Sequence, residues 1–63
     1  ENNEPAHIHV ERGYMLAKYW LEPVELASWK RFREHELTAV RTLVVEHRER
    51  FLKAWHEHFD AEH

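Results

Sequence analysis

The sequence lacks three things that would narrow its function at once: cysteine, a long apolar run and an excess of positive charge. Without cysteine, the chain has neither disulfides nor thiolate metal sites, and it suits a reducing compartment. No apolar stretch approaches the ~20 residues that a membrane-spanning helix needs, and no signal peptide is visible. We therefore expect a cytoplasmic protein with no membrane partner.

Negative charge prevails, with 12 acidic against 9 basic residues and a formal net charge of −3. Proteins that bind nucleic acid without regard to its sequence are usually basic, so a nucleic-acid partner is disfavoured. The seven histidines temper this argument, because adding seven charges to −3 gives +4. Free histidine titrates near pH ~6.5, so the net charge is sensitive to mild acid.

The length of 63 residues predicts a single small domain, residues 1–63. A chain this short buries only ~60% of its unfolded surface, which leaves it marginally stable without help. Since disulfides are excluded, that help is expected from a bound metal or from a partner chain.

The first third of the chain reads as a β-hairpin that follows a loop. Residues 1–5 are polar and contain proline, which is typical of a loop. Residues 6–21 hold an alternating stretch and an aromatic stretch around the turn signal at Gly13. In the first stretch Ile8 and Val10 point to one face, and the polar residues between them point to the other.

The remainder predicts a connection and one long helix. Residues 22–33 are expected to connect the two elements, with 24–28 either a short edge strand or irregular. Residues 34–59 carry an apolar stripe at spacings of three and four, which predicts an amphipathic helix ~39 Å long. The expected fold class is α+β: an antiparallel hairpin or small sheet packed against one long C-terminal helix.

Such a helix is too long for a hairpin to cover, because a hairpin spans about half of it and is itself marginal in water. Another surface is therefore expected on the stripe: a missing strand, a second copy of the chain or a small partner protein. The candidate interface residues lie along the stripe: Val40, Val44, His47, Phe51, Trp55 and Phe59.

His7 and His9 are the first candidate for chemistry, because alternation places both on one face of a strand, ~7 Å apart at Cα. Two imidazoles can share one metal ion such as zinc, although zinc needs three or four ligands. Glu11 continues the row, and Lys18 or Tyr14 is expected to face it across the hairpin. The plainer alternative is that both histidines are half-exposed strand residues that hydrogen-bond to backbone or neighbours.

The same histidines also suit acid–base chemistry. Such a pair would cleave a phosphodiester, as an RNA-cleaving toxin does, if one imidazole acted as base and the other as acid. Lys18 or Arg12 would then hold the phosphate. The candidate catalytic residues are then His7, His9 and Lys18. No nucleophile elbow, phosphate loop or pair of carboxylates supports this hypothesis, so we lean towards a protein that is not an enzyme.

The chain resembles the small bacterial proteins of domain-of-unknown-function family 4160. The likeness lies in "EPAHIHVERG" at 4–13, "AKYWLEPVELA" at 17–27, "EL" at 36–37 and "AWHEHF" at 54–59. Members are described as uncharacterised, and their genes often lie beside another small protein in arrangements like toxin–antitoxin pairs. They usually carry a further strand-forming segment before the "E-P-x-H" loop, where this chain begins. The resemblance therefore favours an interaction module that is one half of such a pair, with a sheet one strand short.

Overall fold

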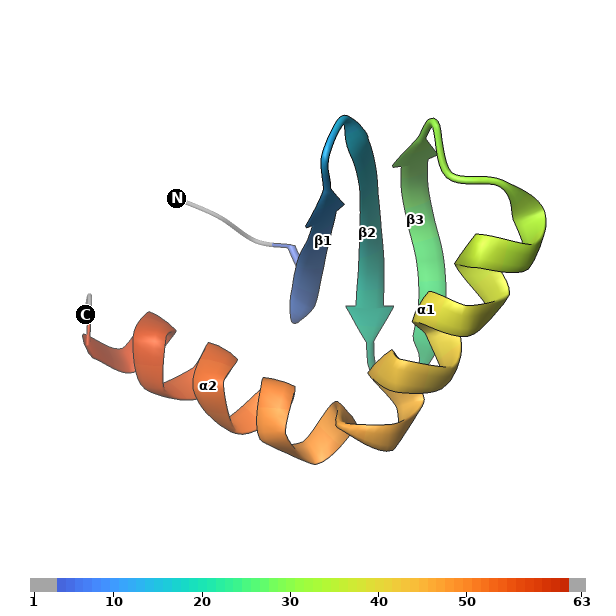
Figure 1. The fold of residues 1–63 in the computed structure, drawn as a ribbon. Helices are drawn as coiled ribbons and strands as arrows, with labels where there is room; N and C mark the ends of the chain where they lie inside the picture. Colours follow the sequence, from blue (N-terminus) through green and yellow to red (C-terminus); the bar gives the residue numbers. More distant parts are fainter. Residues whose placement is uncertain (1–3, 62–63) are drawn as a thin grey trace.

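The computed structural model describes residues 4–61, and their side chains as far as residue 58. It shows a three-stranded antiparallel sheet in the order β1-β2-β3, followed by two helices (Figure 1). The elements are β1 His7–Arg12, β2 Met15–Leu21, β3 Val24–Lys30, α1 Glu34–Glu46 and α2 Arg48–Ala61. This confirms the predicted α+β class, with a small antiparallel sheet packed against the C-terminal helical region.

The predicted hairpin is the pair formed by β1 and β2. Arg12 pairs with Met15 across a two-residue turn, and Gly13 adopts a φ of 61° there. Glycine at the first central position is typical of a type II′ turn, because a side chain would oppose that backbone conformation. The register places His9 directly opposite Lys18, as the sequence predicts for one of its two candidates.

The structure corrects the expected connection at residues 22–33, because most of this range is a full edge strand, β3. Leu26 pairs with Tyr19 and Ser28 pairs with Lys18, so Ala27 is an extra residue in a β-bulge. A bulge shifts the side-chain alternation by one residue, and this removes the period-two pattern by which a strand is recognised. The shorter edge-strand alternative at 24–28 was therefore the right one, with two further residues.

The predicted single helix at 34–59 changes direction at His47 and forms two helices. Figure 1 shows α1 against the sheet and α2 turning back across the strand ends. The guanidinium Nε of Arg48 donates a 2.6 Å hydrogen bond to the carbonyl oxygen of Leu21. This bond fastens the start of α2 to the end of the central strand, so the second helix crosses the sheet instead of running beyond it.

The core lies between the sheet and the two helices. Tyr19 is 1% exposed, and its hydroxyl donates a 2.9 Å hydrogen bond to the carbonyl oxygen of Leu37 on α1. Burial raises the pKa of the Tyr19 phenol above its usual value of 10.0. The buried core residues are Ala6, Ala17, Tyr19, Leu21, Val24, Phe32, Val44 and Leu52. Both helices therefore contribute to one small core around the central strand.

Candidate functional sites

His7 is held at the start of β1 by contacts on two sides. Its Nδ1 lies 2.8 Å from the carbonyl oxygen of Pro5, which requires a proton on that nitrogen and leaves Nε2 without one in the neutral ring. Its ring centroid lies 4.7 Å from that of Trp55 on α2, and its side chain is only 10% exposed. The bond to Pro5 matches the plainer reading of this histidine, a strand residue bonded to backbone.

His9 lies beside His7 on the same face of β1. The two ring centroids are 5.2 Å apart, and the rings are nearly perpendicular at 86°. His9 is exposed, whereas His7 is packed beneath Trp55. The structure therefore brings the paired histidines together as the alternation predicts, but in two different environments.

Lys18 completes this cluster from the neighbouring strand. Its Nζ donates a 2.7 Å hydrogen bond to Oε1 of Glu4 and lies 4.7 Å from the ring centroid of Trp20. The hydrogen bond from Lys18 is the main reason that the pKa of Glu4 is lowered from 4.5. Lys18 is thus already paired with a carboxylate and stacked on an indole, and a phosphate would have to displace Glu4 to use it.

The donor set of this cluster is sparse for a metal. Within residues 4–61, no group of three or more His, Asp or Glu side chains is placed to hold one ion. His7 Nε2 and His9 remain the two imidazole ligands that the sequence indicates, and zinc needs at least one more from the protein or from a partner. The zinc and acid–base hypotheses for His7, His9 and Lys18 stay predictions.

The predicted helix interface is largely occupied by the chain's own sheet. Val44 is 2% exposed in the core, while Val40, Phe51 and Trp55 are partly buried against it. His47 is 43% exposed at the bend, with its ring centroid 6.1 Å from that of Phe51. Phe59 lies outside the residues whose side chains the structure describes.

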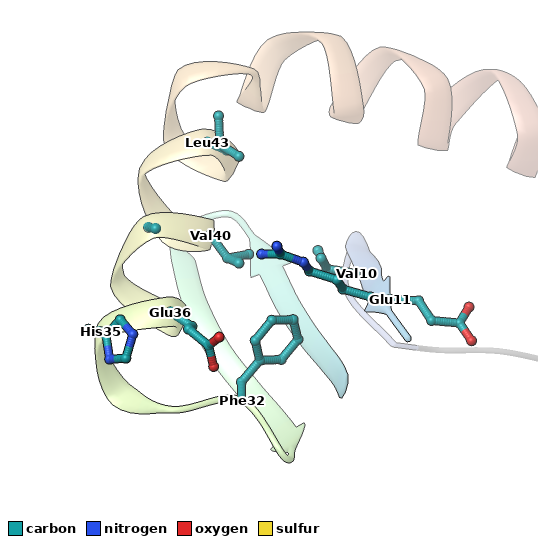
Figure 2. A pocket seen from close by; sticks show the side chains of 9 residues that line it. Val10, Glu11, Phe32, His35, Glu36, Val40 and Leu43 are labelled. Carbon is teal, nitrogen blue, oxygen red and sulfur yellow. The ribbon is translucent and has the colours of Figure 1, made fainter. Parts of the chain in front are cut away.

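A second candidate site is a groove between β1 and α1, with a volume of about 550 Å³. Figure 2 shows Phe32 and Val40 pointing into this space, with Val10 on the opposite wall. We call it the edge groove; it is lined by Val10, Glu11, Arg12, Phe32, His35, Glu36, Ala39, Val40 and Leu43. Its lining combines apolar side chains with charged ones, as the binding sites for polypeptides do.

Sequence reasoning assigned Val40 to an interface but missed the other walls of the edge groove. Leu43 widens the helical stripe and is 55% exposed, although leucine at a stripe position predicts burial. Phe32 lies in the loop between β3 and α1, where its buried side chain also forms a wall of the groove. These residues come together only because the edge strand β1 lies beside one side of α1, and no local sequence motif predicts that arrangement.

The comparisons with known proteins give one result. The family model described as Domain of unknown function (DUF4160) matches residues 1–56. The chain belongs to this family. In this DUF4160 chain the match spans the histidine cluster, the edge groove, all three strands and α1. No curated protein and no solved structure matches the chain.

Membrane insertion has no support from the helices. None of those within residues 4–61 is both long enough and apolar enough to cross a bilayer.

Proposed function

We propose that this DUF4160 chain is a protein–protein interaction module that binds a polypeptide in the edge groove. One observation carries the proposal: an apolar groove of about 550 Å³ lies directly beside the outer strand of the sheet. Pockets of a few hundred cubic ångströms with an apolar centre and a few polar groups are typical of ligand sites. The partner class is a small protein, and the family resemblance favours the other member of a toxin–antitoxin-type pair.

The exposure of the groove's upper wall supports this proposal. Leu43 is 55% exposed and stands next to Val40, which is only partly buried. Burying an exposed leucine against a partner is worth roughly 1.5–3 kcal/mol, so one such contact contributes measurably to affinity. The charged residues of the lining, Arg12 and Glu36 among them, would fix the orientation of the bound segment.

The histidine cluster supports the alternative functions less strongly. A metal site needs a third ligand, and phosphodiester cleavage needs both histidines and a free cation. His7 is 10% exposed beneath Trp55, and Lys18 is bonded to Glu4. Because these contacts restrict access to the cluster, the interaction module remains the function that we propose.

Selection of peptides from a random displayed library tests the proposal. The untagged domain is the bait, and two variants serve as matched baits: Leu43→Lys in the groove, and Val45→Lys on the same helix outside it. Leu43 and Val45 are similarly exposed, at 55% and 48%, so neither substitution disturbs the core. The proposal expects peptides that bind wild type and Val45→Lys but lose at least tenfold in affinity for Leu43→Lys. Peptides that bind all three baits equally would contradict it.

A further inference from the structure

The face of the sheet that points away from the helices is also hollowed. Tyr19 points into the core and bonds to α1, so alternation turns Leu16 and Lys18 of the same strand to the opposite face. Leu16 pairs with Lys30, and Lys18 pairs with Ser28, so both of these β3 residues share that face. Two adjoining pockets, of about 290 and 210 Å³, lie there and share Leu16 and Lys30 in their linings. We call the two pockets together the outer trough.

The position of the outer trough separates it from the edge groove and from whatever lies beside β1. Figure 1 shows the β1–β2 turn and the end of β3 together, at the end of the sheet that lies away from α2. The trough reaches this end over β2 and β3. A strand added beyond β1, which the family resemblance implies, extends the sheet in its own plane and does not cover this face. The edge groove lies on the helix side, where Val40 and Leu43 line it.

The larger pocket of the trough has the lining of an anion site. His9, Lys18 and Lys30 supply nitrogen donors and Ser28 supplies a hydroxyl, while no described carboxylate lines it. Lys18 is bonded to Glu4, but the side chains of Lys30 and Ser28 have no hydrogen bond or ion pair with another described residue. Because solvent and salt screen distant charges, these nearby donors attract an anion even though the net charge of the chain is −3.

The smaller pocket has the lining of a site for a planar ring. Tyr14 is 85% exposed, and the guanidinium carbon of Arg31 lies 6.0 Å from its ring centroid. Aromatic rings and guanidinium planes are the groups on which unpaired nucleobases stack. Leu16 is 43% exposed and adds apolar surface where the two pockets meet. Glu11 also lines this pocket, and its carboxylate can accept a hydrogen bond from the exocyclic amine of a base.

The backbone of Arg31 gives independent support for a ligand here. Its φ is 73°, in the left-handed region that glycine adopts freely and that a residue with a side chain adopts at a cost. Within the described chain, its side chain has no ion pair and contacts only the exposed ring of Tyr14. Residues in such conformations cluster at binding sites. The fold itself would be served better by glycine at this position.

We propose that the outer trough binds a nucleotide unit, with its phosphate at Lys30 and Ser28 and its base against Tyr14 and Arg31. Leu16 lies between the two ends of the ligand. This function is additional to peptide binding in the edge groove. The net negative charge disfavours binding of long nucleic acid without regard to sequence, but it does not disfavour one nucleotide in a local pocket. The same unit is available as a free nucleotide or as one residue of a single strand.

Amide NMR titration of the isotope-labelled chain tests this proposal, with adenosine 5′-monophosphate as the probe. Adenosine, inorganic phosphate and a tetraadenylate strand are the comparison ligands. The monophosphate should shift the amides of Leu16, Lys30 and Arg31 and bind at least tenfold more tightly than adenosine or phosphate. Tighter binding of the tetraadenylate would identify a single strand as the source of the nucleotide, and equal or weaker binding would identify a free nucleotide.

Two variants and one control assign the residues. Lys30→Gln should weaken binding of the monophosphate at least tenfold, whereas Lys53→Gln removes the same charge from an exposed position on α2 and should change it less than twofold. Arg31→Gly should also weaken binding at least tenfold. Because glycine accepts a φ of 73°, this variant should melt at or above the wild-type temperature, which separates the loss of binding from any loss of stability.

Four results would overturn the proposal. Equal affinities for phosphate and the monophosphate would mean an anion site that does not recognise a base. Equal losses in Lys30→Gln and Lys53→Gln would mean attraction to the overall charge, and unchanged binding in Arg31→Gly would remove that arginine from the site. An absence of amide shifts in the trough at millimolar monophosphate would mean that no nucleotide binds there. The dependence of peptide binding on Leu43 is measured separately, so the proposed function would stand in each case.

Discussion

Tyr19→Phe removes one hydrogen bond from the centre of the molecule and leaves the packing in place. The Tyr19 hydroxyl donates a 2.9 Å hydrogen bond to the Leu37 carbonyl oxygen. Because Tyr19 is only 1% exposed, water does not replace the hydroxyl as the partner of that carbonyl in the variant. A net loss of about 1 kcal/mol in the free energy of unfolding is expected. For a domain of this size, that corresponds to a melting temperature lower by ~4–8 °C.

Urea denaturation followed by tryptophan fluorescence measures this change, with Tyr14→Phe as the control. Tyr14 is 85% exposed in the hairpin turn, so its hydroxyl is solvated in both states and its removal should change stability by less than about 0.5 kcal/mol. If Tyr19→Phe were no more destabilising than Tyr14→Phe, the link from the central strand to α1 would not stabilise the fold.

The same residue gives a prediction at alkaline pH. Because burial raises the pKa of Tyr19, the folded state keeps its phenol proton at a pH where the unfolded chain, with a pKa of 10.0, loses it. Stability should therefore fall as pH rises above 10.0, and the fall should be shallower in Tyr19→Phe. Parallel curves for the two proteins would show that the phenol is not responsible.

Three further predictions concern the periphery. Arg48→Ala removes the bond to the end of β2 and should cost about 1 kcal/mol in urea denaturation, while Arg50→Ala at an exposed position should cost less than about 0.5. The lowered pKa of Glu4 means that its bond with Lys18 stabilises the fold above pH 4.5 and is lost as pH falls below it; Glu4→Gln should flatten that part of a stability–pH curve. The zinc hypothesis predicts a melting temperature that rises with zinc, returns with EDTA and does not respond in His9→Ala, and identical curves for the two proteins would refute it.

The sequence predicted the elements whose signals are local. Strict alternation around Ile8 and Val10 predicted the first strand, Gly13 predicted the turn, and the apolar stripe predicted the helical region. The extra residue Ala27 hid β3, because a bulge breaks the alternation by which strands are recognised. The bend at His47 was missed because helical hydrogen bonds continue through it, so the sequence keeps a helical pattern. The His47 N–H donates to the Leu43 carbonyl, and the Phe51 N–H donates to the His47 carbonyl.

The candidate sites divide in the same way. The pairing of His7, His9 and Lys18 followed from strand periodicity and a short turn, which fix a register without knowledge of the rest of the fold. The edge groove depends on how far α1 stands from β1, and that distance is set by tertiary packing around Phe32. Apolar residues such as Leu43 look alike in sequence whether they line a core or a groove.

The central claim is that the edge groove binds a polypeptide, and intermolecular contacts measured by methyl NMR test it most directly. The strongest peptide from the library selection is added to the domain with labelled valine and leucine methyl groups. The account predicts nuclear Overhauser contacts from the peptide to Val10, Val40 and Leu43, which line the groove. Contacts confined to the opposite face of the sheet, around Lys18 and Trp20, would contradict it.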